Sequence, residues 1–149
     1  MATQELDGDP PAKELRRGGV RFVLLHHRAC SGGGFHYRIG ADGKVRPELD
    51  EAERGQHARS IGVVIDGDFD VELPADAQID ALKRLLLTLK LRYPDVQLGA
   101  HRQVHGETPT TCPGRRFPMK ALAAWSRDEL LRQRQDVLTR DFESQYSKI

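Results

Sequence analysis

The chain has 149 residues, 38% of them hydrophobic and 30% charged, which are the proportions of one globular domain with a proper core. Its formal net charge of +1 gives no electrostatic reason to expect a nucleic acid or an anionic membrane as a partner. No apolar run approaches the roughly 20 residues that a membrane span needs.

The two ends of the chain differ from its middle. Residues 1–18 are polar, carry glycine and prolines, and are predicted to be a flexible leader. They lack the apolar run of a secretory signal, so we expect a protein that is cytoplasmic as synthesised and reaches an external substrate, if at all, by another route. Residues 126–149 are heavily charged and predict a helical extension, which leaves residues 19–125 as the main domain.

Two segments are predicted to be central strands of a sheet. Val20–His26 and Ser60–Asp66 are short, rich in β-branched residues and almost continuously apolar. A strand that is covered on both faces shows this pattern. Glycines at 32–34 and at 67 indicate where the chain leaves each strand.

A hairpin is predicted between these two strands. Phe35, Tyr37 and Ile39 alternate with other residues and are expected on one face of a strand. Residues 42–43, Asp-Gly, favour a tight turn because glycine tolerates the positive φ that such turns require. Val45 is expected to begin the return strand.

The second half of the chain predicts two helices and one more strand. Pro74 and Asp76 mark the start of a helix that Pro94 ends. Its apolar residues fall on one stripe, which consists of Ile79, Leu82, Leu86, Leu89 and Tyr93. Residues 96–100 are short and β-like, and a further helix starts near Pro118. Strands interleaved with helices predict an α/β protein around a mixed sheet.

One irregular stretch, residues 99–117, carries metal-binding chemistry. It reads GAHRQVHGETPTTCPGRRF, and its glycines and prolines keep it out of regular structure. His101 and Cys112 are suitable zinc ligands, and His26 or His27 would supply a third. Neighbouring residues of a strand face opposite sides, so only one of these two histidines can reach the site. Three protein ligands with one open place are typical of a catalytic zinc site.

Three motifs occur in the order LLHHR, GFHYRIGADGKV and AHRQVHGETPTTCPGRRF, with QHARSIGVVIDG between the second and the third. This order resembles that of the zinc-dependent N-acetylmuramoyl-L-alanine amidases, which share their fold with peptidoglycan recognition proteins and phage amidases. Over about residues 20–118 the chain therefore resembles this family. The resemblance implies an α/β fold with a mixed central β-sheet flanked by helices, as in the recognition proteins.

The resemblance also implies a reaction and its cofactor. His26, His101 and Cys112 correspond to the ligands of Zn²⁺ in the family. The expected reaction is hydrolysis of the amide between N-acetylmuramic acid and L-alanine. The expected partner is peptidoglycan or a muropeptide, and the chain is expected to be a monomer.

The same resemblance gives candidates for the rest of the site. Thr110, Tyr37 and His57 are candidate catalytic residues. Phe35, His57 and Arg102 are candidate substrate-binding residues. Thr110 matches the threonine that many recognition-type amidases carry two residues before the cysteine.

Two departures from the family pattern leave alternatives open. Phe35 stands where a tyrosine is common, and Val64 where members that cleave recycled muropeptides carry a glutamate. One alternative is therefore a catalytically weak or inactive module of the same fold that binds peptidoglycan or muropeptides. Another is a structural zinc site in which Cys30 is the fourth ligand, although a small buried or loop thiol is the simpler interpretation of Cys30.

Overall fold

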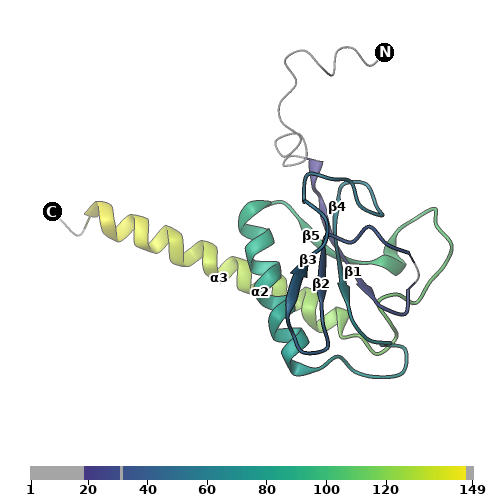
Figure 1. Ribbon diagram of the computed structural model, residues 1–149. Coiled ribbons are helices and arrows are strands. Elements are labelled where there is room, and N and C mark those ends of the chain that lie inside the picture. Colours follow the sequence, from purple (N-terminus) through teal and green to yellow (C-terminus); the bar gives the residue numbers. More distant parts are fainter. Residues whose placement is uncertain (1–18, 31, 147–149) are drawn as a thin grey trace, which may run out of the picture. The chain divides into compact units, whose positions relative to one another are not determined.

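The computed structural model describes residues 19–30 and 32–146, and Figure 1 shows the arrangement of their elements. Five strands form one sheet in the order β3-β2-β4-β1-β5. They are β1 Phe22–His27, β2 Tyr37–Ile39, β3 Val45–Pro47, β4 Ser60–Ile65 and β5 Gln97–Ala100. β2, β4, β1 and β5 run parallel, and β3 pairs antiparallel with β2. The predicted mixed sheet is confirmed, whereas the predicted leader lies outside the described residues.

The two strands predicted to be central form the buried middle of the sheet. β1 lies between β4 and β5, and its Leu25 pairs with Val63 of β4. Both side chains are completely buried, as is Ile61 on β4. The nearly continuous apolar sequences of β1 and β4 follow from this, because both faces of each strand are covered.

Helix α2, Asp76–Arg92, buries its apolar stripe beside the sheet (Figure 1). Leu82, Leu86 and Leu89 on this stripe are buried, as the spacing predicted. The N-cap is Ala75, whose N–H donates to Gln78 Oε1 at 3.0 Å. Asp76 is therefore not the cap; it lies in the first turn, where a negative charge suits the helix dipole.

Phe35 and Tyr37 lie on opposite faces of the sheet, so the predicted alternation is wrong at this point. Tyr37 pairs with Val63, which pairs with Leu25, and paired residues share a face. Phe35 lies over Gly62 on the other face, where a Cβ at Gly62 would be 3.6 Å from the Phe35 Cα. The alternation fails because β2 begins only at Tyr37, and the backbone before it is not extended.

The described residues from Pro118 onward belong to a second compact unit. Within it, α3 runs from Met119 to Tyr146, so the helix predicted near Pro118 is confirmed and continues into the charged segment. Among residues 19–30 and 32–146, no helix has the length and apolar character needed to cross a membrane.

Candidate metal centre

Two parallel strands deliver histidines to the same edge of the sheet. Leu25 of β1 pairs with Ala100 of β5, so the next residues in each strand direction, His26 and His101, become neighbours. His101 opens a short 3-10 helix, η2, which spans His101–Gln103. The two imidazole ring centroids are 4.8 Å apart. Parallel strands place their carboxyl ends at one edge, and the sheet order thus brings these two histidines together.

Cys112 reaches the same place on a loop that is fastened by hydrogen bonds. Its carbonyl oxygen accepts the Arg102 N–H at 2.9 Å. Asp70 also fastens this loop, because its carboxylate accepts hydrogen bonds from the Thr111 hydroxyl and the Arg115 N–H, both at 2.9 Å. The Cys112 side chain is completely buried, and its Sγ lies 3.9 Å from His26 Nδ1.

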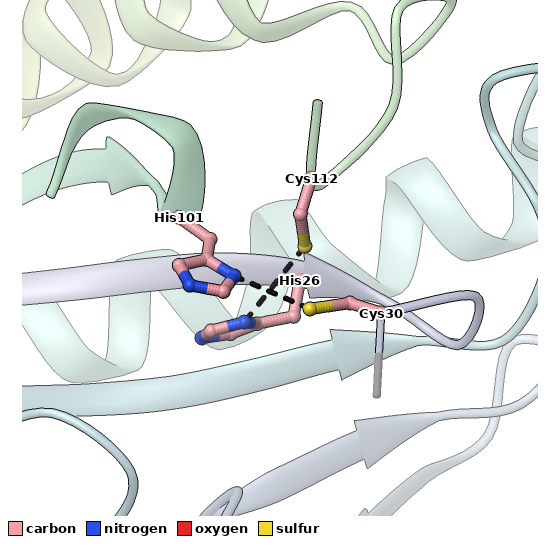
Figure 2. Close-up of side chains that lie close together, drawn as sticks. All are labelled: His26, Cys30, His101 and Cys112. Atoms are coloured by element: carbon pink, nitrogen blue, oxygen red, sulfur yellow. Dashed lines mark hydrogen bonds between the residues drawn. The ribbon is translucent and has the colours of Figure 1, made fainter. Parts of the chain in front are cut away.

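A second sulfur completes the cluster. Figure 2 shows the side chains of His26, Cys30, His101 and Cys112 gathered around one point. Cys30 belongs to the turn after β1, where its N–H donates to the His27 carbonyl at 3.0 Å. Its Sγ lies 3.3 Å from His101 Nδ1, and all four candidate ligand atoms lie within 4.8 Å of one another. Two imidazole nitrogens and two sulfurs are a donor set that suits zinc, so these residues fit that metal.

Burial disfavours charge on the protein groups of the cluster. Desolvation, followed by the neighbouring His101 and His57, lowers the pKa of His26 to about 3. The imidazole is therefore neutral at neutral pH and keeps a lone pair for a metal. Burial also raises the pKa of the Cys112 thiol, so its thiolate form depends on a cation bound beside it.

Glu107, which the sequence analysis missed, connects two histidines around the cluster. Its Oε1 lies 3.3 Å from His101 Nε2, and its Oε2 lies 2.9 Å from His57 Nδ1. His57 in turn stacks on His26, with ring centroids 5.4 Å apart and planes 11° from parallel. A carboxylate on the far nitrogen of a histidine orients that ring towards a metal. Glu107 lies in an exposed loop, so no periodic pattern could have marked it.

The residues that depart from the family pattern also lie at the cluster. The Phe35 ring is buried, with its centroid 4.7 Å from that of His26. Val64 is buried as well and pairs with His26 across β4 and β1. Neither side chain offers a polar atom. Thr110 is nearby, and its hydroxyl oxygen accepts the Cys112 N–H at 3.1 Å.

Tyr37 is not brought to the cluster. Its hydroxyl donates a hydrogen bond to Glu51, a buried carboxylate. Arg92 also donates to Glu51, and the Tyr93 hydroxyl does so at 2.7 Å. These four side chains line a separate hollow of about 680 Å³. Tyr37 thus belongs to a polar network on the face of the sheet opposite to His26.

Arg102 and His27, which the sequence analysis also considered, both make hydrogen bonds to backbone groups. Arg102 Nη1 donates to the carbonyls of Thr111 and Gly114, both at 3.3 Å, and so fastens the loop that carries Cys112. His27 faces away from His26, and its Nδ1 accepts the Phe69 N–H at 3.0 Å. The prediction that His26 and His27 face opposite sides of the strand is confirmed.

Two hollows open beside the cluster. One of about 590 Å³ is lined by His101 and by residues 106–110. Another, of about 650 Å³, is lined in part by His57. Glu107 borders both hollows, so a substrate in the first would meet His101 and a substrate in the second would meet His57, the two histidines that this carboxylate connects.

Comparisons with known proteins place the chain in a family. The family model described as N-acetylmuramoyl-L-alanine amidase matches residues 5–115. The endolysin of Escherichia phage T7 is 35% identical over 131 residues, which cover 80% of this chain and 82% of the endolysin. Among solved structures, the N-acetylmuramoyl-L-alanine amidase LysC from Clostridium intestinale has a TM-score of 0.63 at 26% identity, covering 73% of this chain and 86% of LysC. A mutant of Drosophila PGRP-LB in complex with tracheal cytotoxin has a TM-score of 0.58 at 26% identity, covering 72% and 82%. The chain belongs to the N-acetylmuramoyl-L-alanine amidase family.

Proposed function

We propose that this protein is a zinc-dependent amidase that hydrolyses the amide between N-acetylmuramic acid and L-alanine in peptidoglycan or muropeptides. The observation that carries the proposal is the convergence of His26, His101 and Cys112 from three separate segments of an amidase-family chain. The similarity to a phage endolysin and to a recognition protein solved with tracheal cytotoxin supports a cell-wall fragment as substrate.

In this proposal His26, His101 and Cys112 hold the zinc, and the hydrogen-bonded loop keeps the Cys112 sulfur in place. Bound zinc supplies Lewis-acid chemistry, which polarises the scissile carbonyl and lowers the pKa of water. Glu107 orients His101 through Nε2. It also lies 2.9 Å from His57 Nδ1 through Oε2, and His57 Nε2 has no hydrogen-bond partner among the described residues. We assign proton transfer to that nitrogen, since Phe35 and Val64 leave the site without a hydroxyl or carboxylate at their positions.

The test uses the full chain loaded with zinc and incubated with purified muropeptides. Mass spectrometry should detect stem peptides with a new free L-alanine amine. His101→Ala should lose zinc and activity together, whereas His105→Ala, an exposed residue of the same loop, should retain both. Full activity in the presence of a chelator would exclude the proposed mechanism.

The second candidate function is a module that binds muropeptides without cleaving them. Phe35 and Val64 favour it, because both are buried apolar residues beside His26. Tight muropeptide binding by the zinc-loaded chain with no product, even after long incubation, would select this function over the enzyme.

A further inference from the structure

The second sulfur of the cluster comes from a residue outside the three ligands assigned above. Cys30 lies three residues beyond the end of β1, in a turn that folds back onto the strand through the hydrogen bond to the His27 carbonyl. This turn points the Cys30 sulfur at His101 Nδ1, the nitrogen on the side of the ring away from Glu107 (Figure 2). Cys30 therefore approaches His101 from the side on which a metal would bind.

Two distances between the donor atoms are close to those of a tetrahedral zinc site. Zinc–sulfur bonds of about 2.3 Å and zinc–nitrogen bonds of about 2.0–2.1 Å put sulfur and nitrogen about 3.6 Å apart in a tetrahedron. The Cys30 sulfur lies 3.3 Å from His101 Nδ1, and the Cys112 sulfur lies 3.9 Å from His26 Nδ1. Each sulfur is thus paired with one imidazole at the length of a tetrahedron edge.

Charge balance favours the second thiolate. With Cys112 as the only thiolate, the divalent metal and its direct ligands would carry one net positive charge beside the completely buried His26 and Cys112, and the nearest carboxylate, Glu107, contacts only the far nitrogen of His101. A second thiolate from Cys30 would make the centre neutral, and burial of net charge is costly. Two sulfurs and two imidazoles also form the ligand set of many closed, four-coordinate zinc sites.

We propose that Cys30 is a fourth protein ligand of the metal, and that its sulfur closes the coordination place that hydrolysis requires. Cys30 is only half-buried, in contrast to Cys112. Because Cys30 lies in a turn and is only half-buried, the proposal includes a closed form, in which its sulfur binds the metal, and an open form, in which it does not.

The ligand assignment is tested by spectroscopy and does not depend on activity. Absorption by charge transfer from thiolate to cobalt grows with the number of thiolates, so Co²⁺ is bound to the full chain in place of zinc. Relative to wild type, Cys30→Ser should show about half of this absorption and bind zinc at least about tenfold more weakly. Ala29→Ser, in the same turn, should match the wild type in both measurements.

A second measurement needs no variant. Zinc X-ray absorption of the wild-type protein should show two sulfur neighbours. One sulfur neighbour, or a Cys30→Ser spectrum and affinity equal to those of wild type, would overturn the proposal. A purified chain whose two cysteines form a disulfide and do not react with a thiol reagent would overturn it as well.

The consequence for regulation rests on the proposed function. When a serine replaces the Cys30 thiol, the fourth place is left to water, so muropeptide turnover per bound zinc should rise several-fold over wild type. Unchanged or lower turnover per bound zinc would show that Cys30 does not close the site. If neither protein cleaves muropeptides, the proposed amidase function fails, and the cobalt and zinc measurements still decide whether Cys30 is a ligand.

Discussion

The network around Glu51 allows a prediction whose size follows from the structure. Glu51 is 9% exposed and accepts hydrogen bonds from Tyr37, Arg92 and Tyr93. A hydrogen bond to a charged acceptor contributes about 1.5–3 kcal/mol, and a neutral one about 1 kcal/mol. Glu51→Gln weakens both tyrosine bonds by about 1 kcal/mol each. The Arg92 side chain is 46% exposed, so loss of its ion pair with Glu51 adds only about 0.5 kcal/mol. The free energy of unfolding should therefore fall by about 2–3 kcal/mol.

The stabilisation that the Glu51 carboxylate provides depends on pH, and the pKa of this group gives the direction. Burial by itself raises the pKa of Glu51, but the bonds from Arg92, Tyr37 and Tyr93 outweigh it and lower the pKa below its usual range. A carboxyl group with a lowered folded-state pKa stabilises the protein above its unfolded pKa of about 4.3 and loses this effect as the pH falls. Wild-type stability should therefore decline on acidification more steeply than that of Glu51→Gln.

The assay is urea unfolding followed by circular dichroism, at pH 7 and at a series of lower values. Glu48→Gln is the matched control, because Glu48 pairs with Arg38 at 3.0 Å but is 39% exposed, and such pairs contribute less than about 1 kcal/mol. Tyr37→Phe removes one bond to the charged carboxylate, so it should cost about 1.5–3 kcal/mol and leave kcat unchanged, since its hydroxyl belongs to this network. A Glu51→Gln protein within about 0.5 kcal/mol of wild type at pH 7 would refute the reasoning.

Three further predictions concern the site and its loop. Phe35→Tyr should raise kcat at least about tenfold at unchanged zinc content, by adding a donor for the developing oxyanion; an unchanged kcat contradicts this role. Glu107→Gln should weaken zinc binding about 10–100-fold in a chelator competition, because His101 loses its orienting carboxylate; equal affinity would make that contact incidental. Gly114→Ala should lower the free energy of unfolding by about 2 kcal/mol or more in urea, since Gly114 has a φ of +117° and the new Cβ would lie 2.4 Å from the Phe69 carbonyl carbon. A near-neutral effect would show that the loop can shift.

Local patterns in the sequence were sufficient for most of the fold. The apolar runs at β1 and β4, the Asp-Gly turn before β3 and the stripe of α2 each reflect a period or a turn geometry that neighbouring residues determine. The meeting of His26 and His101 could also be anticipated, because His26 lies near the end of β1, His101 directly follows β5, and these parallel strands end at one edge of the sheet. The family motifs then indicated that His26, and not His27, joins His101, and that Cys112 supplies the sulfur.

Other features depended on contacts between residues far apart in the chain. Whether Tyr37 faces His26 or Glu51 depends on where β2 begins, and the alternating sequence before β2 predicted the wrong face for Phe35. Glu107 reaches two histidines only because its loop returns to them.

The sequence by itself determined the α/β class, the strands and helices, and three residues with the chemistry of a zinc site, because periodicity, turns and motifs are local properties. The tertiary structure decided that Cys30 joins those three residues, since a turn that folds back onto β1 carries its sulfur to His101, 71 positions further along the chain. That placement depends on strand register and loop conformation, and neither is encoded in the residues next to Cys30.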